Sequence, residues 1–287
     1  MRRWITAVVL AGATVLGLAG CGLPAGVDGN LTNQWAAMPA AEGFTPSAGT
    51  CHLSYATTAY RQSYQPQSCD DAHMTETVYV GTADGLAEPP KSGTADYGKL
   101  IQSCEAKVNE FVGGDWHDGR LWFGLTFPGL QTWQGGAHWY RCELLTLDQV
   151  LGEETQHTGS LKGELAKPGS TVRLGCFSYT SGKAVTPVAC TKKHNAEYVG
   201  SVAMPSFAAV KDRAKVIKVC QQRIAAYVGM KYSSDLKYRT GLFWDPMTES
   251  EYAAGDHKIR CFAWFSPDTK TKSIKGAGAK ALPIHYA

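Results

Sequence analysis

Short blocks rich in apolar and aromatic residues recur along the chain and are typical of strands; one of them, residues 171–177, also alternates between apolar and polar positions. Six such blocks are residues 121–127, 139–145, 171–177, 197–203, 239–244 and 258–265. Elsewhere the apolar positions follow the spacing of a helix: Val216, Val219, Cys220, Ile224 and Val228. Gly229 follows directly and is a suitable cap. The pattern predicts a helix over residues 209–228 and an α+β fold built on antiparallel sheets.

The N-terminus has a different pattern, in which positive charge precedes a long apolar run. Arg2 and Arg3 come before residues 4–20, which are rich in Ala and Gly. About 17 residues are marginal for crossing a hydrocarbon core of about 30 Å, so the run is typical of an export signal; an uncleaved membrane anchor is the alternative. Residues 18–21 read Leu-Ala-Gly-Cys, which resembles the lipobox of bacterial lipoproteins.

A lipobox makes its cysteine the first residue of the mature chain, where the thiol takes a diacylglyceryl group through a thioether. We therefore predict that residues 1–20 are a lipoprotein signal peptide and that Cys21 is lipidated. Each buried CH₂ contributes about 0.8 kcal/mol, so two acyl chains such as palmitate hold a protein durably on a membrane. The expected location is the cell membrane, lipid-anchored, on its extracytoplasmic face.

The rest of the chain contains the same order of residues twice, which indicates a tandem duplication. The pattern Cys-x-x-x-His-x-x-Glu, followed by an apolar segment, begins at Cys69 and again 121 positions later at Cys190. Further along, residues 104–113 match 220–229, and residues 136–142 match 255–261. Cys51 and Cys176 begin the two copies. Each copy is predicted to be a small α+β domain with one helix packed on an antiparallel sheet.

This reading divides the chain into six parts. Residues 21–46 are a flexible tether after the signal peptide, residues 47–150 are copy 1, residues 151–170 are a polar linker, and residues 171–268 are copy 2. Residues 269–287 are a basic tail with four lysines and no acid. The tail is suited to anionic lipid or acidic wall polymer, but a solvated, frayed terminus is the simpler expectation.

Eight cysteines remain once Cys21 is lipidated, and an exported protein meets an oxidising environment, so disulfides are expected. Four cysteines in each of two domains allow 3 × 3 = 9 pairings. We favour pairing first with second and third with fourth in each copy. The resulting bonds are Cys51–Cys69, Cys104–Cys142, Cys176–Cys190 and Cys220–Cys261.

A metal site is the alternative use of the repeated polar residues. Two imidazoles and one carboxylate suit Zn²⁺ if they converge. The low-priority candidates are His73, Glu76 and His138 in copy 1, with His194, Glu197 and His257 in copy 2. Residues three apart on a strand point to opposite faces, and duplication also copies structural hydrogen bonds. We therefore expect a structural or binding role, with no metal and no cofactor.

Catalytic motifs give no support to an enzyme. The chain has no Gly-x-Ser-x-Gly, His-Glu-x-x-His or phosphate-binding loop. Lys+Arg 28 against Asp+Glu 25 gives a net charge of +3, which does not favour nucleic acid as a partner. Hydrophobic residues at 44% and charged residues at 18% argue against a disordered chain or a multi-span membrane protein.

Taken together, the repeated motifs resemble the septum-formation domain of actinobacterial envelope proteins. They comprise Cys-x-x-x-His-x-x-Glu leading to Val-Gly, a helical cysteine, Tyr/Phe-Val-Gly, and a late Trp or Tyr before Arg-Cys. The late aromatic is Trp133 in copy 1 and Tyr252 in copy 2. The resemblance covers residues 47–147 and 171–266. It implies a protein of cell division or envelope assembly, and it brings no catalytic residues.

Two functional hypotheses follow. The first is a non-enzymatic lipoprotein that binds a division or envelope protein, or a wall polymer, through exposed aromatics. The candidates are Trp116, Trp122, Trp133, Trp139 and Trp244, of which Trp133, Trp139 and Trp244 are the leading ones, although we expect most of them to pack in the core. The second is a metal-dependent envelope enzyme that uses the His/Glu sets. A solute-binding lipoprotein is disfavoured because such proteins are larger, two-lobed α/β chains.

Overall fold

The computed structural model describes residues 44–150, 152–180, 185–265 and 267–285. The predicted signal peptide, the lipidation site at Cys21 and almost all of the tether lie outside these residues. In the part that is described, no helix is long and apolar enough to cross a lipid bilayer.

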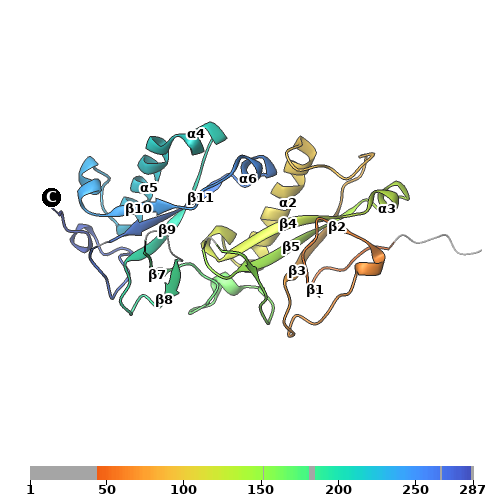
Figure 1. Ribbon diagram of the computed structural model, residues 1–287, viewed down its shortest axis with the longest axis horizontal. Coiled ribbons are helices and arrows are strands. Elements are labelled where there is room, and N and C mark those ends of the chain that lie inside the picture. The colour runs from red at the N-terminus through yellow and green to blue at the C-terminus, as the bar shows by residue number, and fades with distance from the viewer. Residues whose placement is uncertain (1–43, 151, 181–184, 266, 286–287) are drawn as a thin grey trace, which may run out of the picture. The chain divides into compact units, whose positions relative to one another are not determined.

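The protein has two sheets in which every strand pair is antiparallel except β2 with β4 (Figure 1). The first sheet has the order β1-β3-β5-β4-β2, with β6 also paired to β5. The second has the order β10-β11-β9-β7-β8. Their strands are β1 (Cys51–His52), β2 (Thr58–Ala59), β3 (Thr75–Thr82), β4 (Leu121–Pro128), β5 (Trp139–Leu147), β6 (Glu154–Thr155), β7 (Cys176–Ser178), β8 (Thr186–Val188), β9 (Ala196–Ala203), β10 (Gly241–Trp244) and β11 (Lys258–Trp264).

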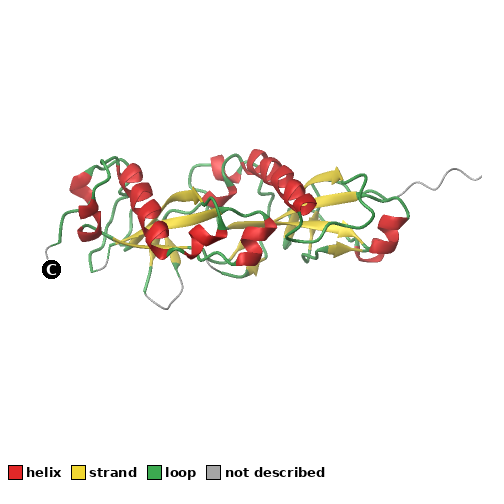
Figure 2. Ribbon diagram, turned by 90° about the horizontal axis from the view of Figure 1, so that it is seen from above, coloured by secondary structure: helices red, strands yellow, loops and turns green. Residues whose placement is uncertain are grey.

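One long helix packs on each sheet, and both lie over the strands when seen from above (Figure 2). Helix α2 (Ala95–Val112) covers the first sheet and α5 (Arg213–Val228) covers the second. Each ends at a glycine in the left-handed region, Gly113 at φ 77° and Gly229 at φ 80°, where a side chain would be strained. The shorter helices are α3 (Leu130–Gln134), α4 (Phe207–Lys211) and α6 (Glu249–Ala254).

The helix predicted over residues 209–228 is two helices, α4 and α5. The chain breaks at Asp212, whose extended backbone is not helical and whose carboxylate accepts hydrogen bonds from the backbone N–H of Ala214 and Lys215. This is an N-cap, which begins a new helix at Arg213. Short 3₁₀ turns complete the structure: η2 (Arg61–Ser63), η3 (Trp116–Asp118), η4 (Glu164–Ala166), η5 (Ser234–Tyr238) and η6 (Ala279–Ala281).

The two sheets share an irregularity as well as a strand order. The pairing of β3 with β5 skips Val78, because Glu143 faces Thr77 and Cys142 faces Tyr79. The pairing of β9 with β11 skips Val199, which lies 121 positions after Val78. The strand order β1-β3-β5-β4 also corresponds to β7-β9-β11-β10. A bulge adds local twist and bends its strand, so both sheets bend at the same point.

Four disulfides tie the elements together. They are Cys51–Cys69, Cys104–Cys142, Cys176–Cys190 and Cys220–Cys261, the same pairs that the sequence analysis favoured. Cys104 joins α2 to β5, and Cys220 joins α5 to β11. All four of these helix and strand cysteines are fully buried within the two hydrophobic cores. Each long helix is thus held covalently against the centre of its sheet.

Two segments expected to be a linker and a frayed tail are packed parts of the fold instead. In the first, Ser160 Oγ and Leu161 N–H donate to the buried carboxylate of Glu76 at 2.6 and 2.8 Å. In the second, Ile274 N–H donates to Glu197 at 2.9 Å, and Ser273 Oγ donates to the same carboxylate. The flanking apolar side chains are buried: Leu161, Leu165, Ile274 and Leu282.

These contacts explain why the sequence analysis misassigned both segments. The segments contain little hydrophobic periodicity, and each is held by a carboxylate from a distant strand rather than by its own pattern. Both read Ser-Leu/Ile-Lys-Gly where they meet that carboxylate, at residues 160–163 and 273–276. The same four-residue order therefore occurs after each sheet, outside the bounds predicted for the two copies.

The packed tail predicts a measurable cost at Ile274, whose exposed fraction is 2%. Replacing Ile274 by Ala removes buried methyl groups and leaves a cavity, so we expect the free energy of unfolding to fall by about 2–4 kcal/mol. The neighbouring Lys275 is exposed, and Lys275→Ala should change it by no more than about 0.5 kcal/mol. Chemical denaturation of both variants measures the difference. Equal, small effects would show that the tail contributes nothing to folding.

Candidate functional site

The histidine and glutamate sets predicted from the sequence do not converge as proposed. His73 and Glu76 are buried in the first sheet, but His138 lies elsewhere, with Nδ1 3.7 Å from Asp84 and its ring against Trp133. In the second sheet, His257 Nε2 lies 3.1 Å from the Tyr252 carbonyl. Among the described residues, neither His138 nor His257 belongs to a group with metal-ligand spacing.

The repeated glutamates have a structural role in both sheets. As described above, Glu76 and Glu197 each accept hydrogen bonds from a serine hydroxyl and from the next backbone N–H. Glu197 also accepts a bond from the Tyr227 hydroxyl at 2.7 Å. Burial together with the charge of Glu197 raises the pKa of Tyr227 above its ordinary value. These carboxylates therefore anchor the segments that follow each sheet.

The candidate tryptophans are mostly core residues. Trp116, Trp133 and Trp139 are buried, and the indoles of Trp133 and Trp139 donate to the carbonyls of Leu86 and Phe44. Trp133 and Trp139 are therefore not available as a contact surface. Trp122 and Trp244 are half-buried and remain candidates.

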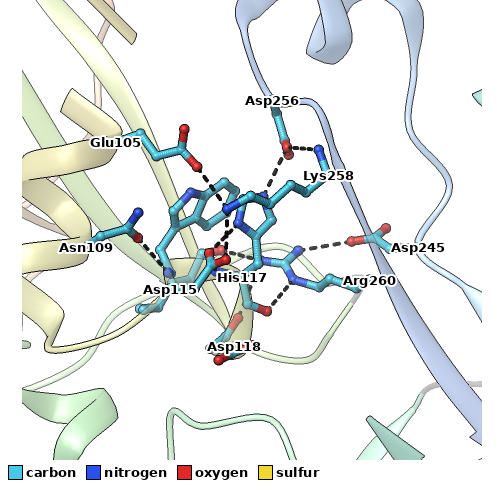
Figure 3. Close-up of polar contacts among 12 residues, drawn as sticks. Glu105, Asn109, Asp115, His117, Asp118, Asp245, Asp256, Lys258 and Arg260 are labelled. Carbon is cyan, nitrogen blue, oxygen red and sulfur yellow. Dashed lines mark hydrogen bonds and ion pairs between the residues drawn. The ribbon is translucent and has the colours of Figure 1, made fainter. Parts of the chain in front are cut away.

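A group of ionisable side chains lies where η3 meets β11 (Figure 3). We call it the His117 cluster and define it as Asp115, His117, Asp256, Lys258 and Arg260. We call the part of the chain up to residue 170, with the first sheet, the first half, and the part from residue 171, with the second sheet, the second half. His117 is 1% exposed, and both of its ring nitrogens face carboxylates. Nδ1 lies 2.7 Å from Asp115 Oδ1, and Nε2 lies 3.0 Å from Asp256 Oδ1.

Local structure holds η3 in the position that this cluster requires. Asp115 is its N-cap and accepts the backbone N–H of His117 at 3.1 Å. Asn109, on the last turns of α2, accepts the N–H of Trp116 at 2.8 Å. The Trp116 ring lies against the His117 ring with centroids 3.8 Å apart. Contacts within the first half thus position the imidazole independently of its contact with the second half.

Arg260 supplies the main hydrogen bonds from the second half to the first. Its Nε donates to the His117 carbonyl at 3.0 Å and its Nη2 donates to the Leu121 carbonyl at 3.0 Å. Its Nη1 pairs with Asp245 at 3.0 Å. The guanidinium also lies 5.1 Å from the centre of the Trp116 ring, in reach of a cation–π contact. A charged side chain buried this way is stable only because all of its sides are paired.

The electrostatics of the cluster favour the charged forms. Burial opposes the imidazolium of His117, but the hydrogen bonds to Asp115 and Asp256 outweigh it and hold the pKa of His117 above its ordinary value. Burial raises the pKa of Asp115, but the bonds from His117 and Lys258 lower it far more, so that the carboxylate stays ionised. Lys258 Nζ lies 2.8 Å from Asp115 and 3.5 Å from Glu105, and these acids raise its pKa despite burial.

A cleft of about 1020 Å³ opens beside the cluster. Its apolar lining includes Tyr55, Tyr97, Trp116, Trp122 and Phe123. Its charged lining consists of six acidic and two basic residues. The acidic residues are Glu105, Glu153, Glu154, Asp245, Glu251 and Asp256, and the basic residues are Lys258 and Arg260. Acidic residues therefore outnumber basic residues in the lining, so the cleft is suited to a cationic ligand with an apolar body.

Sequence reasoning missed the His117 cluster because it looked for residues that occur in both copies. Residues 115–118 read Asp-Trp-His-Asp, and the matching stretch after Gly229 has no histidine. The only signal available was this difference between the copies. A residue that occurs in only one of two similar halves is a candidate for contact between the halves.

The comparisons with known proteins gave one match. A family model described as septum formation matches residues 48–261, a single region that contains both sheets up to Cys261. No curated protein and no solved structure matches the chain at a significant level.

The His117 cluster predicts a stability that depends on pH. Because the folded-state pKa of His117 lies above the unfolded value of about 6.5, its stabilisation is complete below that pH and is lost as pH rises through the folded-state pKa. His117→Gln leaves carboxylates unpaired and should lower the free energy of unfolding by about 3 kcal/mol near pH 6. Guanidinium denaturation between pH 6 and pH 9 measures both effects.

The control is His257→Gln, because His257 is exposed and its ring faces only a carbonyl and the Tyr252 ring. This variant should keep the wild-type loss of stability with rising pH, whereas His117→Gln should flatten it. The same slope in His117→Gln and wild type would mean that another group carries the pH dependence.

Proposed function

Because the chain belongs to the septum-formation family, we propose that it acts in septum formation or envelope assembly as a non-enzymatic, extracytoplasmic protein that binds a protein partner. The observation that carries this proposal is the family match over residues 48–261, which makes up well over half of the chain. Family membership supports the process, and the cleft described above supports the proposal that a partner binds there.

Membrane attachment through Cys21 is part of the proposal. Its support is the sequence alone: two arginines, an apolar run and a Leu-Ala-Gly-Cys junction at residues 18–21. Two acyl chains would keep the protein on the outer face of the membrane, where the four disulfides are stable.

We also propose that the two halves are copies of one domain. The shared strand order, the bulges at Val78 and Val199, and the matched disulfides support this. The equivalent contacts of Glu76 and Glu197 support it too, and they extend each copy through the segment that its glutamate anchors. Copy 1 would then run to about residue 170, and copy 2 to the C-terminal segment.

The partner that best fits the cleft is a basic protein segment. Among the carboxylates that line it, Asp245, Asp256 and Glu105 already meet Arg260, His117 or Lys258. Glu153 and Glu154 are exposed, and they line the cleft together with the half-buried Trp122. Lysine or arginine side chains combine a cation with an apolar stem, so they would pair with the acids and lie along the aromatic lining.

A role without catalysis is supported by how the reactive residue types are used. All eight cysteines of the described residues are in disulfides, which leaves no thiolate nucleophile in that part of the chain. The His117 imidazole is held by two carboxylates and is buried, so it has no free nitrogen for proton transfer. We infer that the His117 cluster holds the two halves together.

The cleft is tested by reversing its edge charges in cells. We expect Glu153→Lys with Glu154→Lys to repel a basic partner, so that cells carrying only this variant divide late and grow long. The measurement is the number of septa per cell length in a strain complemented by each version of the protein.

The matched control reverses another adjacent, exposed acidic pair, Asp70→Lys with Asp71→Lys, which changes the net charge equally but lies outside the cleft. This control should divide normally. If the cleft variant also complements fully while remaining folded, the partner binds elsewhere. A defect of both variants would indicate a general effect of charge, and would also count against the cleft.

Lipid attachment is tested at Cys21. Labelling cells with an alkyne analogue of palmitate should mark the wild-type chain and leave Cys21→Ser unlabelled. The variant should also leave the membrane fraction, or retain its signal peptide as a larger species. A labelled Cys21→Ser chain would contradict the assignment, because no other residue follows a lipobox.

A further inference from the structure

Two histidine rings meet across an antiparallel bridge in the first half, where the predicted candidates His73 and Glu76 lie beside His157, which was not among the predicted ligands. His73, just before β3, exchanges both backbone hydrogen bonds with His157, at 2.9 and 3.0 Å. Directly opposed residues of an antiparallel pair project their side chains from the same face. The two rings accordingly lie with their centroids 4.1 Å apart.

The hydrogen bonds of the two rings leave the same nitrogen free on each. His73 Nδ1 lies 2.8 Å from the Asp71 carbonyl, which accepts only if Nδ1 carries the proton. His157 Nδ1 lies 3.3 Å from the Thr146 hydroxyl. The Nε2 atoms of both rings are buried and have no hydrogen-bond partner. A buried acceptor without a partner is costly, so this arrangement calls for an explanation.

Glu76 completes the group. One nitrogen of each ring and one oxygen of Glu76 all lie within 4.8 Å of one another. The Glu76 oxygens accept from Ser160 and Leu161, and each carboxylate oxygen has a further lone pair. The hydrogen bond from His73 Nδ1 to a carbonyl is the second contact that metal-bound histidines usually make, because it fixes the ring and its tautomer.

We propose that His73, Glu76 and His157 bind a divalent transition metal ion of the zinc type. Two imidazole nitrogens and one carboxylate oxygen are a donor set that Zn²⁺ prefers. Bonds of about 2.0–2.1 Å in a tetrahedral site place ligand atoms about 3.4 Å apart, so closing the group needs a movement of about 1 Å. His157 is half-buried and provides the route of entry.

The tautomer of His73 suits this role. Because His73 Nδ1 carries the proton that it donates to the Asp71 carbonyl, the unpartnered Nε2 of His73 is left with a free lone pair. Neutral imidazole is the form that binds metal. Bound metal would tie residues 154–161 to the start of β3, beside the anchor that Glu76 already provides.

The second half supplies an internal comparison. His194 makes the same backbone bridge, at 2.9 and 2.8 Å, but with Lys270 in place of a histidine. Lys270 points its ammonium toward the Phe265 ring, 5.7 Å away. The second half therefore keeps the bridge and the glutamate anchor without the second imidazole. The fold tolerates lysine at this position, and only the first half has the pair.

The experiment measures Zn²⁺ binding to the whole folded chain purified without an affinity tag. We expect one Zn²⁺ per chain after dialysis, and a rise in melting temperature when Zn²⁺ is added. His157→Lys copies the bridge of the second half, so it should fold and lose more than about 100-fold in zinc affinity. His157→Gln is the second variant and should behave in the same way.

His138→Gln and His257→Gln are the controls for adventitious binding to single histidines. Both should keep the wild-type stoichiometry and the zinc-dependent rise in melting temperature. Zinc affinity in His157→Lys and His157→Gln equal to that of wild type would overturn the proposal, as would a wild-type chain that retains no zinc. Cell division by cells that carry His157→Lys is measured separately from zinc binding. A failure of the zinc proposal would therefore not contradict the proposed binding of a partner in the cleft.

Discussion

His117 lies where water cannot solvate a charged ring, and this constraint governs how the two halves meet. A buried imidazolium is stable only when carboxylates take the place of water, and here one carboxylate comes from each half. Asp115 belongs to the same turn as His117, whereas Asp256 lies just before β11. Neither half alone satisfies both ring nitrogens. The same contacts help to form the cleft beside the His117 cluster, because Asp256, Lys258 and Arg260 line it.

The Arg-Cys motif shows how two similar halves acquire different roles. In the first half, Arg141 stays inside its own sheet, 2.9 Å from both Glu143 and His52. In the second half, Arg260 has the same place before the cysteine but reaches carbonyls of the first half. Arg141 therefore stabilises the interior of its own half, whereas Arg260 binds the first half across the interface. The difference arises from the partners that surround each residue, because the local strand geometry is the same.

Much of the fold was predictable from the chain because its signals are local or repeated. Apolar and aromatic blocks identified β4, β5, β9, β10 and β11, helical spacing identified α5, and repeated cysteines indicated the disulfides. The anchored segments after each sheet were not predictable in this way, since Ser160 and Ser273 are held by glutamates 84 and 76 positions away. His117 was missed because it occurs once. His157 was not predicted because it pairs with His73 through an isolated bridge. One pair of residues is too short to leave a periodic pattern in the sequence.

The position of the second anchored segment has a consequence for how the chain reaches its folded state. A chain is made from its N-terminus, and the first half has its anchor at residues 160–161, well before synthesis ends. Each of the four disulfides closes within one half, so the first half can oxidise and pack while the second is still emerging. The second half receives Ile274 and Leu282 last. Its hydrophobic core thus stays open until residues 274–282 have been added, and a stop codon just after Cys261 would leave a fully oxidised but unfinished domain.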